Sequence, residues 1–119
     1  MKKSQLTSLF RAMSVVEPEK ANCLQQSVRA SRPVVVKRDL EISMAGLSCG
    51  EVSLLAWKIL GTGADEFMTL SEDSIPLTIR MLVKGYRHDQ AVEAGESGVL
   101  GLAAANFRRY LDWIVIIRF

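Results

Sequence analysis

Two short stretches combine small residues with polar groups of the kind that line binding sites. The first is Gly95-Glu96-Ser97-Gly98, in which a carboxylate and a hydroxyl stand between glycines. The second is Ala45-Gly46, inside a region rich in small residues that continues to Gly50. A backbone without bulky side chains permits close approach by other groups. Ala45 and Gly46 are therefore candidate contacts either for a cofactor or for a packed strand.

Each candidate polar group also has a purely structural explanation. Ser97 stands where a helix is expected to begin, and a serine at that point is a common N-cap. Glu96 is either a site carboxylate or an acid of the first helical turn, which the helix dipole favours. Glu17 and Glu51 leave the same two alternatives open. The residue types alone are compatible with both roles.

The other reactive residue types form no recognisable site. Cys23 and Cys49 lack the CxxC or nearby His spacing of zinc sites, so we expect reduced, buried thiols and no metal. His88, the single histidine, falls in a polar loop and is expected to be solvated. Gly61-Thr62-Gly63 lacks the third glycine of a dinucleotide-binding fingerprint, and we interpret it as a helix stop followed by a turn.

The composition is that of an ordinary globular domain. Of 119 residues, 49% are apolar and 24% are charged, and the formal net charge is +2. The basic residues are scattered, without the clusters that nucleic-acid binding requires. No apolar stretch approaches the roughly 20 residues that cross a bilayer, and the first residues lack the apolar core of a signal peptide. We expect a cytoplasmic protein with no nucleic-acid and no membrane partner.

The elements that position the candidate residues alternate between strands and helices. Short apolar runs predict strands at 12–16, 67–70 and 90–94. Helical periodicity and caps predict helices at 19–30, 51–60, 72–84 and 99–108. Pro18 is expected in the first turn of helix 19–30, and helix 51–60 is expected to be mostly buried and to end at Gly61. Helix 72–84 is expected to have Ser71 as its N-cap and to end at Gly85. Such alternation is typical of a parallel sheet. The predicted fold class is α/β, an incomplete parallel β-sheet with covering helices.

A sheet of three or four strands has at least one open edge. The tail, residues 111–119, is aromatic and β-branched and has no turn signal, and we interpret it as an extra strand that would be prone to aggregate if exposed. The open edge and the apolar tail are the features through which the chain could self-associate.

Three stretches, in this order, resemble the fold type II pyridoxal-phosphate (PLP) enzymes, the group of tryptophan synthase β, threonine dehydratase and serine racemase. Residues Val16-Glu17-Pro18-Glu19-Lys20-Ala21 are similar to a strand-to-helix VEPE junction of the dehydratase branch. Met44-Ala45-Gly46-Leu47 is similar to an ADG turn, although Met44-Ala45 replaces Ala-Asp. Gly95-Glu96-Ser97-Gly98 resembles the segment beside the pyridine ring of the cofactor.

The longer sequence from Met44 to Glu51, together with Trp57 and Gly95-Glu96-Ser97-Gly98, looks closest to the diaminopropionate ammonia-lyases. This resemblance covers residues 14–104. It implies PLP as cofactor, an amino-acid substrate, and α,β-elimination of 2,3-diaminopropionate to pyruvate and ammonia in amino-acid catabolism. It also implies that Ser97 offers its hydroxyl to the pyridine nitrogen, with Glu96, Ala45 and Gly46 near the cofactor.

The same resemblance implies that catalytic parts are missing. In the family, the Schiff-base lysine and the glycine-rich phosphate loop precede the VEPE junction, and no lysine of this chain stands in a similar context. We therefore expect no catalytic residue here, no elimination by this chain alone and no PLP bound by it alone.

Two interpretations follow for the whole chain. In the first, it is a fragment from the C-terminal half of such a lyase. Residues 14–108 then form a partial PLP-dependent lyase-like α/β domain, and residues 1–13 and 109–119 are non-matching end segments. The alternative is a small non-enzymatic α/β interaction module that self-associates through its open sheet edge or pairs with a partner chain.

Overall fold

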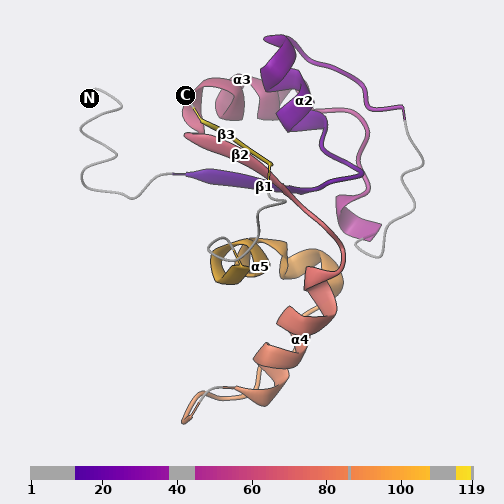
Figure 1. The fold of residues 1–119 in the computed structure, drawn as a ribbon. Coiled ribbons are helices and arrows are strands. Elements are labelled where there is room, and N and C mark those ends of the chain that lie inside the picture. The colour runs from indigo at the N-terminus through magenta and orange to yellow at the C-terminus, as the bar shows by residue number, and fades with distance from the viewer. Residues whose placement is uncertain (1–12, 38–44, 86, 108–114, 119) are drawn as a thin grey trace.

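The computed structural model describes residues 13–37, 45–85, 87–107 and 115–118. Strands and helices alternate along the first part of these residues, as the apolar pattern predicts, and this confirms the α/β class (Figure 1). The elements are β1 (Ser14–Pro18), α2 (Cys23–Ala30), the 3-10 turn η1 (Ala45–Leu47), α3 (Leu54–Gly63), β2 (Glu66–Leu70), α4 (Ser74–Lys84), the 3-10 turn η2 (Glu96–Gly98), α5 (Leu100–Phe107) and β3 (Val115–Arg118).

The sheet has the order β1-β2-β3, with β2 in the middle. β1 and β2 are parallel, with Ser14 opposite Glu66 and Pro18 opposite Leu70, which confirms the predicted parallel pairing. The prediction of an extra strand in the tail is confirmed for 115–118. This strand pairs antiparallel with β2, so the described sheet is mixed rather than purely parallel.

The core lies on both faces of β2, whose five residues are all buried. Successive side chains of a strand point to opposite faces. Phe67 accordingly packs with Val28 and Ala64, on the face that α2 and α3 cover. Met68 and Leu70 pack on the other face in a cluster that includes Leu100, Ala103 and Ala104 of α5. Figure 1 shows this layering, with α2 and α3 on one side of the sheet and α5 on the other.

The predicted start of the first helix is too early. Pro18 is the last residue of β1 rather than part of a first helical turn, and α2 begins at Cys23. Glu19 still donates its backbone N–H to the carbonyl of Leu70 at 3.0 Å, which continues the strand pairing past Pro18. The strand pairing therefore competes successfully with helix initiation at this point.

The helix after η1 is exposed, and the prediction of a mostly buried helix there is wrong. α3 starts after Ser53, whose Oγ accepts a hydrogen bond from the N–H of Ala56 at 3.4 Å, and it continues past Gly61 to Gly63. None of its residues is buried, although it is mostly apolar. Only one side of α3, which includes Ala56 and Trp57, packs against neighbouring residues of the core. The apolar content of the segment predicted a helix but did not show that its other side is exposed.

The other helix boundaries follow local chemistry. α4 has Asp73 at its N-cap position rather than the predicted Ser71, which instead accepts a hydrogen bond at its Oγ from the N–H of Asp73, at 3.3 Å. Pro76 lies in the first turn, where its missing N–H costs nothing. Gly85 ends the helix as predicted, with a positive φ of 66°.

Residues 90–94 form no strand, so that prediction is wrong. The segment runs back along the end of α4, where Val92 donates its N–H to the carbonyl of Leu82 at 2.9 Å. A short apolar run becomes a strand only when a neighbouring strand forms hydrogen bonds with its backbone N–H and C=O groups. The backbone N–H of Val92 instead bonds to a carbonyl near the end of α4.

Candidate functional site

The two candidate stretches meet in space although they are 51 residues apart in sequence. Gly46 in η1 donates its backbone N–H to the Oγ of Ser97 in η2, at 2.9 Å. A Cβ at position 46 would lie 2.9 Å from the Oγ and 3.1 Å from the Cβ of Ser97. A larger residue at position 46 would push against the Ser97 side chain, and the group that Gly46 approaches is a second turn rather than a packed strand.

Ser97 does not occupy the N-cap position that its sequence context also allowed. α5 begins at Leu100, three positions later. A serine hydroxyl carries one proton and two acceptor lone pairs, and the N–H of Gly46 uses one lone pair. Ser97 is thus oriented as an acceptor toward η1 and keeps its own proton for another group. Glu96, beside it in η2, is exposed.

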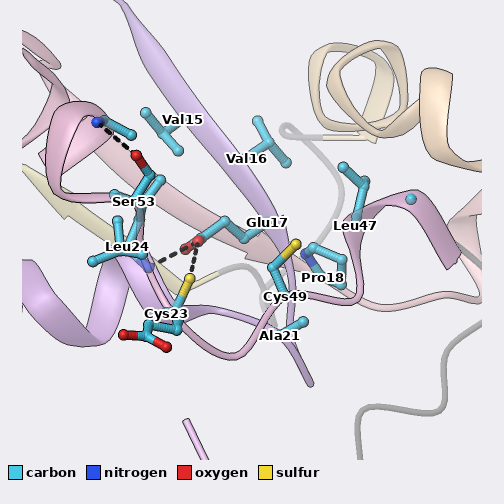
Figure 2. Close-up of a pocket in the computed structure, with 14 residues that line it drawn as sticks. Val15, Val16, Glu17, Pro18, Ala21, Cys23, Leu24, Leu47, Cys49 and Ser53 are labelled. Atoms are coloured by element: carbon cyan, nitrogen blue, oxygen red, sulfur yellow. Dashed lines mark hydrogen bonds between the residues drawn. The ribbon is translucent and has the colours of Figure 1, made fainter. Parts of the chain in front are cut away.

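Gly46 also lines a cavity of about 350 Å³. Figure 2 is a close-up of this cavity. Its walls come from β1, the start of α2, η1 and the start of α3. Most of the lining is apolar, with Val16 and Leu47 on facing elements, and Gly46 belongs to it as well. The volume is at the lower end of what small-molecule sites offer.

Glu17 is the buried carboxylate of this cavity, with 7% of its surface exposed. It accepts hydrogen bonds from the backbone N–H groups of Leu24 and Gln25, both at 2.9 Å. Figure 2 shows the hydrogen bond from Leu24. These are orphan donors in the first turn of α2, which the Asn22 side chain leaves uncapped. Burial raises the pKa of Glu17, and the two hydrogen bonds oppose that rise. Glu17 therefore caps a helix from the preceding strand, a role that neither sequence-based alternative included.

The two cysteines are free thiols in different environments. Cys23 is buried, and burial together with the nearby charge of Glu17 raises the pKa of its thiol to about 11. Its Sγ donates to the carboxylate of Glu17 at 3.9 Å. Cys49 lines the same cavity but is exposed, so the expectation of buried thiols is right for Cys23 only.

Other site types find no support within the part of the chain that the structure describes. No group of three or more His, Cys, Asp or Glu side chains there could hold a metal ion. His88 is exposed, as expected for a solvated loop residue. Among these same residues, no helix combines the length and the apolar character that a bilayer crossing needs.

Comparison with known proteins identifies the class of enzyme whose fold this chain shares. No protein-family model matches the chain. Its structure superposes on a holo diaminopropionate ammonia-lyase from Escherichia coli with a TM-score of 0.74 and 31% identity, over 91% of this chain and 27% of that one. It also superposes on a threonine deaminase from T.th. with a TM-score of 0.70 and 25% identity, over 92% of this chain and 39% of that one. The chain has the fold of part of a fold type II PLP enzyme.

Within that class, the sequence is related to diaminopropionate ammonia-lyase. It is 39% identical to the enzyme of Escherichia coli (strain K12) over 88 residues, and 33% identical to that of Salmonella typhimurium over 98 residues. Each match covers 74% of this chain but only 22% of the relative, so the chain spans less than a quarter of their length. The E. coli lyase has also been solved with an aminoacrylate-PLP azomethine reaction intermediate and with D-serine.

Proposed function

We propose that this chain forms one wall of a PLP site of the diaminopropionate ammonia-lyase type and does not catalyse elimination by itself. The contact between Gly46 and Ser97 carries the proposal. It joins the two stretches that the family resemblance associates with the cofactor, although nothing in their sequence spacing requires them to meet.

The residues of this wall fit a cofactor that contains a pyridine ring. Gly46 has no Cβ, so η1 approaches the Ser97 side chain closely, and the Gly46 N–H holds the Ser97 hydroxyl in place. Ser97 accepts from Gly46 and retains its proton, which it would donate to a pyridine nitrogen if PLP were bound. Glu96 is an exposed carboxylate one position away in η2, and Ala45 precedes Gly46 in η1. PLP would supply the electron sink for α,β-elimination when bound.

The wall lacks the amine that such chemistry needs. The described lysines are Lys20, Lys37, Lys58 and Lys84, and all of them are exposed. None belongs to the lining of the cavity beside Gly46. A covalent link to the cofactor would have to come from a lysine elsewhere in a complete lyase fold. We propose 2,3-diaminopropionate as the substrate of that complete site, following the named activity of the relatives, and a cytoplasmic setting, where free thiols such as Cys23 and Cys49 persist.

The alternative of a non-enzymatic interaction module is favoured by one observation, the apolar and exposed surface of α3. The two functions differ in whether the chain completes a PLP site when the rest of a lyase fold is supplied, and a first test establishes what the chain does alone. The test is to mix the purified chain with PLP, reduce with borohydride and determine the mass of its peptides. We expect no pyridoxyl adduct on any lysine. An adduct on a single lysine would show that the chain carries its own nucleophile.

A second arm tests the wall itself, in a complex with the rest of a lyase fold. Ser97→Ala should weaken PLP binding about fivefold, the equivalent of one hydrogen bond of about 1 kcal/mol. Gln90→Ala, in an exposed loop, is the control and should leave binding unchanged. Equal PLP affinity in the Ser97→Ala complex and the unmodified complex would remove Ser97 from the site.

A further inference from the structure

The contact between η1 and η2 depends on a hydrogen bond that is weak by itself. The bond from the Gly46 N–H to the Ser97 Oγ is exposed to water. Water competes for both groups of an exposed hydrogen bond, so the net contribution of the bond is small. A second interaction is therefore needed to hold the two turns together.

η2 is fixed in place by the residues that follow it. Val99 and Leu100 are 1% and 3% exposed, and they belong to the core cluster on the α5 side of the sheet, together with Met68 and Leu70. Ser97 lies two positions before Val99, so its backbone can move little while that close-packed cluster is intact. The position of η1 therefore decides whether the contact forms.

η1 reaches the same core cluster through Leu47. The Leu47 side chain is half-buried and packs against the cluster, whereas Gly46 beside it is exposed. Leu47 also lines the cavity described above (Figure 2), so one part of its side chain contacts the cluster and another part faces the cavity. Its carbonyl accepts a hydrogen bond from the N–H of Cys49 at 2.9 Å, which closes the turn after η1. Leu47 thus connects η1 to the core.

We propose that Leu47 is a positioning residue of the cofactor wall. Its packing on the core cluster holds η1 where the Gly46 N–H reaches the Ser97 Oγ, at 2.9 Å. That bond occupies one lone pair of the hydroxyl and so restricts the directions in which the remaining proton points. Leu47 acts through Gly46 and Ser97 rather than on the cofactor. The inference rests on the proposed function, because the direction of this proton matters to the site only when it meets a pyridine nitrogen.

Hydrogen exchange of the Gly46 amide, followed by NMR in the full 119-residue chain, tests the role of Leu47. Leu47→Ala should lower the protection of this amide about tenfold, because the loss of packing lets η1 open locally. Leu47→Met keeps the volume of the side chain and should restore most of the protection. Ser97→Ala removes the acceptor and gives the lower limit. Leu47→Val, a smaller truncation, provides the same comparison should Leu47→Ala fail to fold.

The matched control is Leu82→Ala, which truncates a half-buried leucine of α4 that packs against the same cluster. It should lower the free energy of unfolding in urea but leave the protection of the Gly46 amide unchanged, because a local opening does not depend on global stability. Two results would overturn the proposal. They are an unchanged protection of Gly46 in Leu47→Ala and an equal loss of protection in Leu82→Ala.

PLP binding by a complex with the rest of a lyase fold provides a readout that a merely structural role would not move. Leu47→Ala should weaken PLP binding about threefold, less than Ser97→Ala, and should have no further effect once Ser97 is alanine. An equal effect of Leu47→Ala in both backgrounds would overturn the positioning role. If the protection of Gly46 falls in Leu47→Ala but neither variant changes PLP affinity, the proposed function is refuted, and Leu47 remains the residue that holds the two turns together.

Discussion

Replacing Gly46 by alanine tests the contact on which the site depends. The new Cβ would lie 2.9 Å from the Oγ and 3.1 Å from the Cβ of Ser97, closer than unstrained atoms approach. Overpacking of this kind costs about 1–3 kcal/mol. Gly46 is exposed and Ser97 half-buried, so both turns have room to yield, and we expect a loss of about 1–2 kcal/mol in the free energy of unfolding, in the lower part of that range.

A double-mutant cycle separates this clash from a general effect of alanine. Ser97→Ala removes the acceptor of a partly exposed hydrogen bond and should cost about 0.5–1 kcal/mol. It also removes the atom that the new Cβ meets first, so the double variant should be more stable than the sum of the single effects by about 1 kcal/mol. Gly95→Ala is the control, because a Cβ there meets no atom within 4 Å.

Urea unfolding followed by circular dichroism measures all four free energies on one scale. The reasoning would be refuted if Gly46→Ala were as stable as Gly95→Ala, or if the two single effects were additive. Either result would mean that η1 and η2 are not in contact in solution, and the proposed cofactor wall would lose its main support.

Two further predictions concern the buried end of the cavity. Because burial raises the folded pKa of Glu17 above its unfolded value, its contribution to stability is full below the unfolded pKa of about 4.3 and is lost as pH rises through the folded pKa. Glu17→Gln should therefore flatten the dependence of the free energy of unfolding on pH above the unfolded pKa of Glu17. Urea titrations from acid to neutral pH measure this dependence. An unchanged slope would contradict the raised pKa of Glu17. In a thiol-reagent assay near pH 8, Cys49 should react at least about 100-fold faster than Cys23, because a buried thiol with a pKa of about 11 is almost entirely protonated. Cys49→Ser should abolish the fast phase and Cys23→Ser should retain it, and the reverse pattern would show that Cys23 is accessible.

Local sequence determined most of the elements and the family. The mostly apolar run at 67–70 was sufficient to predict β2, and Gly85 was sufficient to predict the end of α4, because both features depend on residues close together in the sequence. The motifs around Glu17, Gly46 and Ser97 identified the lyase relationship, since each keeps residue types in a fixed order. The exposure of Leu54 and Ile59 was not predictable in this way, because helical periodicity shows that an apolar side exists but not whether anything covers it.

The sequence by itself determined the α/β class, the types of the candidate residues and the absence of a lysine in the expected motif. Only the tertiary structure decided how those residues act. It showed that Gly46 donates to Ser97, that Glu17 caps α2 from a neighbouring strand, and that 115–118 pairs antiparallel with β2. Each of these is a contact between residues that are separated along the chain or belong to different elements. Such contacts depend on how the sheet and helices pack together, and no local pattern of residues encodes that packing directly.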